Sequence, residues 1–280
     1  MWRMSLGDRA EGVARLRCAV AAIEGRGEAA LPRAAARLPL TRALDRALGG
    51  GLATDGLHEI APASPADGSA AMGFALALAA RFMAVRGRTA IVMAEDFALA
   101  EMGALYGPGL AAFGLDLGQL VFVRAPDAPA LFQAMEDALK SGAPAAVIGE
   151  AWRLKSYDLA ASRRLLLAAR AGGAPALLTA ASAYGAADGF SSAAETRFEI
   201  AAAPSAHLPS AGGGRGLPGA PAFAVRLVKA RIGAGGAGQG ADPTRIFRLT
   251  WRAEELSFDE PTLSLPVAAA ADDRSRAARA

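Results

Sequence analysis

The fold of this chain is decided by residues 57–95, which read LHEIAPASPADGSAAMGFALALAARFMAVRGRTAIVMAE. A short apolar run over 57–60 predicts a buried strand, and a longer alanine- and leucine-rich run over 70–85 predicts a helix. Gly87 stands where a helix C-cap is expected, and the apolar run over 89–94 predicts the next strand. A strand, a helix and a strand in this order indicate two parallel strands joined by a helical crossover.

The same alternation continues along the chain. Further apolar runs predict strands over 120–123, 145–149 and 175–180, and alanine- and leucine-rich runs predict helices over 98–113, 128–140 and 158–171. Because the strands are apolar along almost their whole length, both faces of the sheet should be covered by helices. The expected fold class is therefore α/β, with a mostly parallel sheet flanked by helices.

The C-terminal part of the chain has a different rhythm. Polar and apolar residues alternate over 197–203, 222–229 and 245–251, which predicts antiparallel strands that extend the sheet. The connections between them are rich in glycine, alanine and proline, as in mobile loops. The stretch from about Pro261 has no periodic apolar face, so we expect a disordered tail.

The N-terminal part predicts one amphipathic helix over residues 9–24, because Val13, Leu16, Val20 and Ile23 share one helical face. We therefore expect three parts in the chain. They are a helical extension over 1–40, a core over 41–260 whose added strands begin near residue 197, and the tail over 261–280.

Composition excludes several classes of protein. Hydrophobic residues make up 53% of the 280, enough for a sizeable core, and no run of eighteen uncharged apolar residues predicts a membrane span. The start of the chain carries charges where a secretory signal would be apolar, so we expect a cytoplasmic protein without a membrane partner. A single cysteine, Cys18, excludes an internal disulfide, and His58 and His207 have no neighbours at ligand spacing. We expect neither a metal nor another cofactor.

Charge is distributed unevenly. Residues 54–150 carry five bases against eleven acids, whereas residues 197–252 carry eight bases against two acids. The candidates for binding a partner or DNA in the basic part are Arg226, Lys229, Arg231, Arg245, Arg248 and Arg252. Basic residues beside flexible loops suit the phosphates of single-stranded DNA or an acidic protein surface. Aromatic residues for base stacking are few there, which favours a protein partner.

The turn after the first predicted strand is where an α/β fold of this kind commonly binds phosphate, at spacing G-x-x-x-x-G-K-[ST]. Here no lysine occurs between Thr41 and Lys140. Counting back from Gly87 predicts the lysine's place near Met72 and the place of the metal-binding hydroxyl near Gly73. Without these groups the charge on a transferring phosphoryl group is not stabilised, so ATP hydrolysis is not expected.

Several stretches resemble a known family. ALDRALGGGLATDGLHEI, residues 43–60, and the run over 90–152 have the order and spacing of the core of RecA-type recombinases. LYGPGLAAFGLD, DLAASRRLLLAARAGGAPALL and TRFEIAAAPS resemble more closely the ImuA family, the RecA-like proteins of bacterial damage-induced mutagenesis cassettes. The resemblance covers roughly residues 40–255 and implies a RecA-like core.

The resemblance also implies places for two acids. Glu95 falls where the recombinases carry their water-activating glutamate, and Glu150 falls where a metal-coordinating acid ends its strand. Together with Asp67, Gly68 and Ser69 of the turn, they look like the remains of a nucleotide site. The alternative is that both glutamates are merely solvated acids at strand ends.

The function that the resemblance implies is a non-catalytic accessory or scaffold protein in SOS-induced translesion DNA synthesis and DNA repair. Its partners would be an inactive Y-family polymerase homologue (ImuB-like) and an error-prone C-family DNA polymerase, with RecA as a further candidate. Two alternatives stay open. One is a nucleotide-binding ATPase whose phosphate loop uses only the backbone amides of Asp67 to Ala71, and the other is a SulA-like inhibitor of cell division.

Overall fold

The computed structural model describes residues 36–180, 191–205, 207–208, 217–231, 242 and 244–260. The amphipathic helix predicted over 9–24 and the tail predicted over 261–280 lie outside these residues, and so does most of the two glycine-rich connections.

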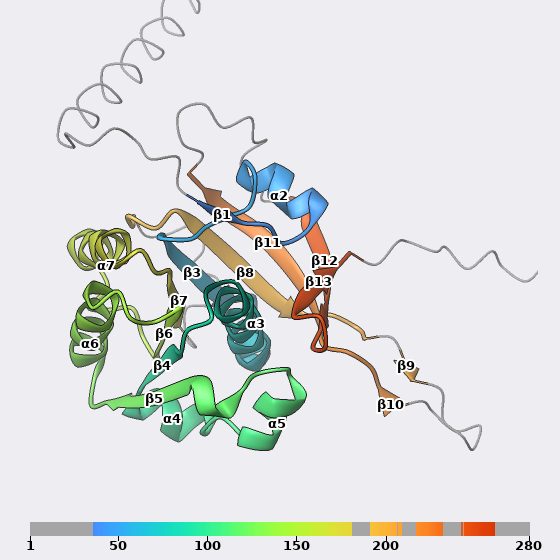
Figure 1. The fold of residues 1–280 in the computed structure, drawn as a ribbon, viewed down its shortest axis with the longest axis horizontal. Helices are drawn as coiled ribbons and strands as arrows, with labels where there is room; N and C mark the ends of the chain where they lie inside the picture. The colour runs from blue at the N-terminus through green and yellow to red at the C-terminus, as the bar shows by residue number, and fades with distance from the viewer. Residues whose placement is uncertain are drawn as a thin grey trace, which may run out of the picture. The chain divides into compact units, whose positions relative to one another are not determined.

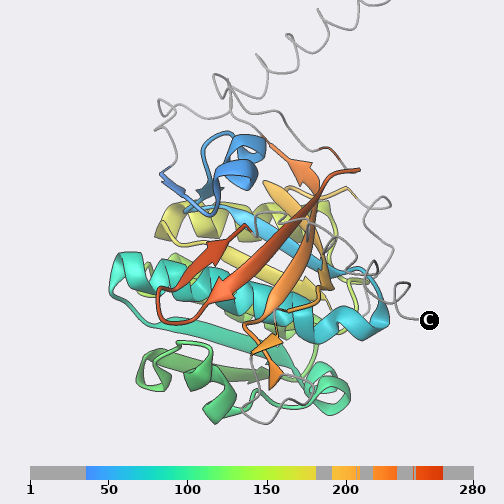
Figure 2. The same cartoon turned by 90° about the vertical axis from the view of Figure 1, so that its right-hand side faces the viewer.

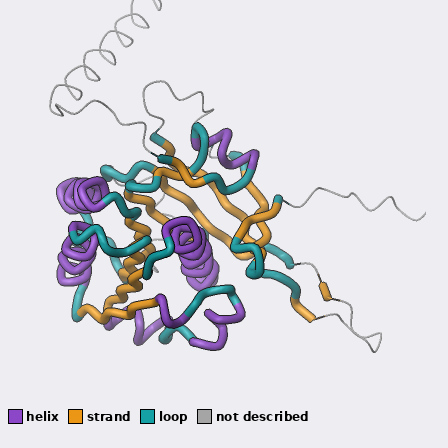
Figure 3. Tube along the Cα trace, viewed as in Figure 1, coloured by secondary structure: helices purple, strands orange, loops and turns teal. Residues whose placement is uncertain are grey.

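A nine-stranded sheet forms the centre of the described part (Figures 1 and 3). Its order is β13-β12-β11-β8-β3-β7-β6-β4-β5. The strands are β3 (Leu57–Pro62), β4 (Ala90–Glu95), β5 (Leu120–Ala125), β6 (Ala146–Ala151), β7 (Ala176–Ala180), β8 (Thr196–Ala202), β11 (Ala222–Ala230), β12 (Ile246–Arg252) and β13 (Ser257–Asp259). Strands β5, β4, β6, β7, β3 and β8 run parallel, and β11 to β13 add antiparallel strands. The predicted RecA-like α/β fold is confirmed.

Helices cover both faces of the parallel strands, as Figure 1 shows. Helix α3 (Gly68–Arg86) packs on one face, and α6 (Ala128–Lys140) and α7 (Leu159–Gly172) pack on the other. Successive strand residues point to opposite faces, so Val147 joins the core under α6 and α7 while Ile148 joins the core under α3. The near-continuous apolar strands follow from this two-sided burial.

Helix α3 is almost entirely apolar, and by length and composition alone it could cross a membrane. However, 67% of the most apolar 18-residue stretch within residues 65–86 is buried inside the protein. Its position in the core accounts for this composition, because a helix buried on most sides has no polar face to keep.

Strand β8 differs from its prediction. The alternating residues predict an antiparallel strand, but β8 pairs with β3 in parallel, with Thr196 opposite His58. Alternation reports that the two faces of a strand differ, and it carries no information on the direction of the neighbouring strand. The antiparallel additions therefore begin at β11, which Figure 2 shows from the side of the added strands.

The helix predicted over 98–113 is two helices, α4 (Asp96–Met102) and α5 (Gly107–Ala112). Gly103 ends α4 with φ at +81°, and a proline lies in the first turn of α5, where its missing N–H costs nothing. The smaller elements are β1 (Arg37–Leu38), α2 (Arg42–Leu48), β2 (Leu52–Ala53), the 3₁₀ turns η1 (Pro65–Asp67) and η2 (Leu117–Gln119), β9 (His207–Leu208) and β10 (Leu217–Pro218).

Candidate nucleotide site and basic strands

The turn between β3 and α3 is short and closed. β3 ends at Pro62 and α3 begins at Gly68, and part of the turn between them is the 3₁₀ helix η1. The carboxylate of Asp67 accepts hydrogen bonds from the Ala202 N–H at 2.8 Å and from the Ser64 hydroxyl at 2.6 Å. The first bond ties the turn to the end of β8 and the second lies within the turn, whereas a phosphate loop would lie open.

Two backbone amides of the turn are engaged as well. The Ala63 N–H donates to the Ile200 carbonyl at 2.8 Å, and the Asp67 N–H donates to the Ser64 carbonyl at 3.0 Å. Pro65 has no N–H to offer. A phosphate cradle needs several N–H groups aimed at one anion, and here a carboxylate already stands beside the helix N-terminus.

The start of α3 fixes which residues follow the loop glycine. Because α3 begins at Gly68, the two residues after this glycine are Ser69 and Ala70. In the phosphate-binding motif, the lysine and the hydroxyl residue follow the glycine that begins the helix. The count back from Gly87 predicts those places at Met72 and Gly73, which lie in the second turn of α3. Met72 is buried in the core, and neither register supplies a lysine.

The two candidate glutamates have different surroundings. Glu95 accepts a hydrogen bond from the Trp152 N–H at 2.8 Å, so it ties the end of β4 to the end of β6. Glu150 is 8% exposed, and its carboxylate makes no hydrogen bond to another described residue. Burial raises the pKa of Glu150 to about 7. Neither glutamate is therefore a simple solvated acid.

Little space remains between Glu150 and the turn. The cavity there has a volume of about 10 Å³ and is lined by Pro62, Gly68, Ala71, Glu150, Thr179 and Ala180. A cavity of about 10–15 Å³ is needed to hold a single water. The start of α3 is also covered, because a Cβ on Gly68 would lie 2.6 Å from the terminal carbon of Met102.

The six basic candidates fall into two groups. Four of them contact other side chains or the backbone. Arg226 forms an ion pair with Glu199, and Arg252 forms one with Asp259 at 2.6 Å. Lys229 donates to the Ser192 carbonyl at 2.7 Å, and the Arg245 guanidinium lies 4.7 Å from the centre of the Phe247 ring. The side chains of Arg231 and Arg248 are exposed and make no ion pair within the described ranges. Two of the six candidates are therefore exposed cations without an ion pair among the described residues.

Comparison with known proteins identifies the family of the chain. No model of a protein family matches the chain. Protein ImuA of Caulobacter vibrioides (strain NA1000 / CB15N) is 32% identical over 225 residues, a match that covers 71% of this chain and 82% of that protein. Protein ImuA of strain ATCC 19089 / CIP 103742 / CB 15 matches to the same extent. The chain belongs to the ImuA family. Membership supports a role in the damage-induced mutagenesis cassette, as the sequence resemblance implies.

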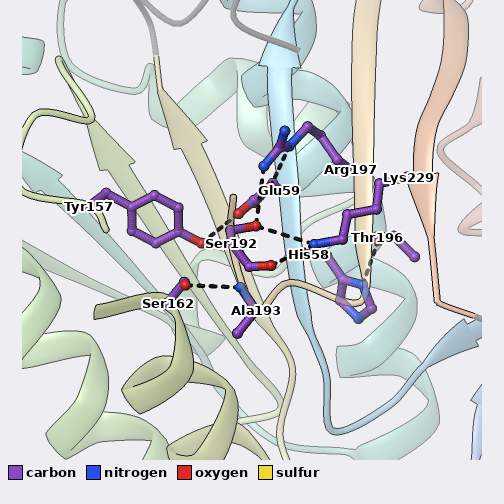
Figure 4. Close-up of polar contacts among 9 residues, drawn as sticks. All are labelled: His58, Glu59, Tyr157, Ser162, Ser192, Ala193, Thr196, Arg197 and Lys229. Carbon is purple, nitrogen blue, oxygen red and sulfur yellow. Dashed lines mark hydrogen bonds and ion pairs between the residues drawn. The ribbon is translucent and has the colours of Figure 1, made fainter. Parts of the chain in front are cut away.

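This ImuA-family chain also holds a buried polar cluster that the sequence does not predict (Figure 4). Glu59 on β3 accepts hydrogen bonds from Arg197 at 2.6 Å and from the Tyr157 hydroxyl at 2.7 Å. Arg197 also donates to the Ser192 hydroxyl at 3.1 Å, and Lys229 holds the Ser192 carbonyl. The only signal in the sequence is a single acid inside the otherwise apolar start of β3.

The cluster fixes the core of this ImuA-family chain. The side chains of Glu59 and Arg197 are each 6% exposed, so their ion pair joins β3 to β8 away from water. His58 lies between the Thr196 hydroxyl and the Ala53 carbonyl, each at 2.8 Å, and burial lowers its pKa to about 4. Each polar group is satisfied by a neighbour, which fits a structural role. No metal-binding cluster occurs within the described ranges.

Proposed function

We propose that this ImuA-family protein is a non-catalytic scaffold in SOS-induced translesion DNA synthesis. The observation that carries the proposal is the closed turn between β3 and α3. Its Asp67 carboxylate is bonded to Ala202 and Ser64, and the cavity beside it has about 10 Å³. A nucleoside triphosphate needs a phosphate cradle with a positive counter-charge, and this turn carries the Asp67 carboxylate and no lysine.

The proposed partners come from the family resemblance. They are an inactive Y-family polymerase homologue, an error-prone C-family polymerase and RecA, all met in the cytoplasm. In this account the RecA-like core supplies a rigid frame, and the surfaces of the sheet and its edges supply the docking sites. Arg231 and Arg248 are available to an acidic partner or to single-stranded DNA, because they are exposed and not paired within the described part of the chain.

Affinity capture from the native cells, before and after DNA damage, tests the proposal. We expect both polymerase-type partners or RecA to be recovered, more strongly after damage. A deletion strain should show fewer damage-induced mutations, and overexpression should leave septation normal. Recovery of a division protein together with blocked septation would support the SulA-like alternative and contradict the scaffold.

A further inference from the structure

Glu150 also lines a second and much larger hollow. This hollow has a volume of about 200 Å³ and lies beneath α4 and the segment that follows it. Its walls are mainly apolar, and the residues that matter here are Val92, Leu99, Leu105, Phe122, Arg124 and Glu150. Arg124, Ala94 and Glu150 lie in register on neighbouring strands, so they share one face of the sheet.

The hollow opens beside β5, the last strand of the sheet. Among the described residues β5 pairs only with β4, and its Phe122 is 53% exposed. Natural edge strands are usually protected by charges or prolines, whereas this one carries one exposed charge, Arg124, and also exposes Val121 and Phe122. Such a patch marks a binding surface.

The wall of the hollow carries one carboxyl group, that of Glu150, without a partner among the described residues. Glu150 is 8% exposed, and no hydrogen bond or ion pair within the described ranges reaches its carboxylate. A buried charge without a partner is costly, so a cation beside it would be favourable. Arg124 does not provide this cation for Glu150, because its guanidinium pairs with Asp96 at 2.9 Å and its side chain is 74% exposed.

The surroundings of the hollow are acidic as well. Glu101, Asp116 and Asp127 are exposed on the elements around β5, and residues 54–150 carry five bases against eleven acids. A positively charged partner segment would be attracted to this face, and an acidic one or a nucleic acid would be repelled.

We propose that this hollow binds a lysine or arginine side chain on a basic segment of a partner protein. The apolar stem of that side chain packs against Val92, Leu105 and Phe122, and its cation pairs with Glu150. Apolar neighbours in the same segment cover the exposed ring of Phe122. The inference rests on the proposed scaffold function for its biological meaning, but the binding can be measured without any polymerase or nucleotide.

Selection of random twelve-residue peptides displayed on phage, with the full chain as bait, tests this. We expect enriched peptides to share one lysine or arginine beside apolar residues. Synthetic copies labelled with fluorescein should bind, and changing the shared basic residue to glutamine should weaken binding at least tenfold. No enrichment, or enriched peptides without a shared basic residue, would overturn the inference.

Variants of the protein locate the binding. Glu150→Gln should weaken the peptide at least tenfold, and Phe122→Asp should abolish binding. Leu159→Asp on α7 is the matched control, because Leu159 is also 53% exposed, and it should leave binding unchanged. Equal binding by wild type and Glu150→Gln would overturn the inference. Displacement of the peptide by n-butylammonium at the same concentration as the peptide would also overturn the inference. The hollow would then select a small amine and not a protein segment.

Discussion

Replacing Glu150 by glutamine should stabilise the protein at alkaline pH and leave its stability almost unchanged at acidic pH. Burial raises the pKa of Glu150 from 4.5 to about 7, so the folded protein holds this proton more tightly than the unfolded chain does. The stability that the proton supplies is fully present below pH 4.5 and is lost as the pH rises through 7. Glutamine has nearly the same shape and stays neutral, so it avoids that loss.

The magnitude follows from the same pKa. At about 1.4 kcal/mol per pH unit, a rise from 4.5 to about 7 corresponds to about 3 kcal/mol of unfolding free energy above pH 7. The groups facing Glu150 from adjacent strands do not cancel it. Ala94 on β4 and Thr179 on β7, the residues in register with Glu150, carry no charge, and Arg124, one strand further away on β5, is paired with Asp96.

Urea unfolding of both proteins, followed by tryptophan fluorescence, measures the difference. We expect Glu150→Gln to be more stable by about 3 kcal/mol at about pH 8.5, and by less than about 0.5 kcal/mol at about pH 4.5. Other titrating groups, including His58, are present in both proteins, so their effects cancel in the comparison. Equal stability at both pH values would refute the claim that Glu150 is buried without a partner.

Three further substitutions test the turn, the buried cluster and the basic strands. Asp67→Ala removes two hydrogen bonds that close the turn and should lower the unfolding free energy by about 1–3 kcal/mol in urea unfolding. Arg197→Met leaves Glu59 without its ion-pair partner and should cost about 3–5 kcal/mol, and adding Glu59→Met should recover much of that loss. Arg231→Ala combined with Arg248→Ala should make the protein elute from heparin at lower salt.

Controls for these variants come from the same chain. Glu101→Ala removes an exposed carboxylate that makes no hydrogen bond within the described residues, and it should change stability by less than about 0.5 kcal/mol. Arg252→Ala removes a cation already paired with Asp259, so it should shift heparin elution less than either exposed arginine does. Unchanged stability of Asp67→Ala would contradict the first prediction. Equal losses of stability in Arg197→Met and in the double variant with Glu59→Met would contradict the second. Unchanged heparin elution of the double arginine variant would contradict the third.

The alternation of strands and helices could be predicted because it depends on local signals. Helix α6 has the bounds predicted for it, since Asp127 caps its start and the apolar stripe runs to Lys140. The break between α4 and α5 was missed because Gly103 reads as one more residue of an apolar run. The direction of β8 was missed because it depends on pairing with β3, far away in the sequence.

In the candidate site too, features set by local sequence could be predicted, whereas contacts between distant residues could not. The missing lysine is visible in the sequence, but the closed turn depends on a bond between Asp67 and Ala202, residues 135 positions apart. The buried ion pair of Glu59 and Arg197 spans 138 positions. Contacts of this kind arise from the packing of β3 against β8, and no local pattern reports them. The basic strands could be predicted from charge, yet only the structure shows which arginines are already paired.

Equilibrium dialysis of the purified protein against labelled ATP and magnesium tests the central claim most directly. A RecA-type recombinase with an intact phosphate loop, measured alongside, shows that the assay detects binding. The closed turn predicts no saturable binding in the micromolar range, for the wild type and for Glu95→Gln alike. Saturable micromolar binding by the wild type would contradict the account, because the turn would then open to hold a nucleotide.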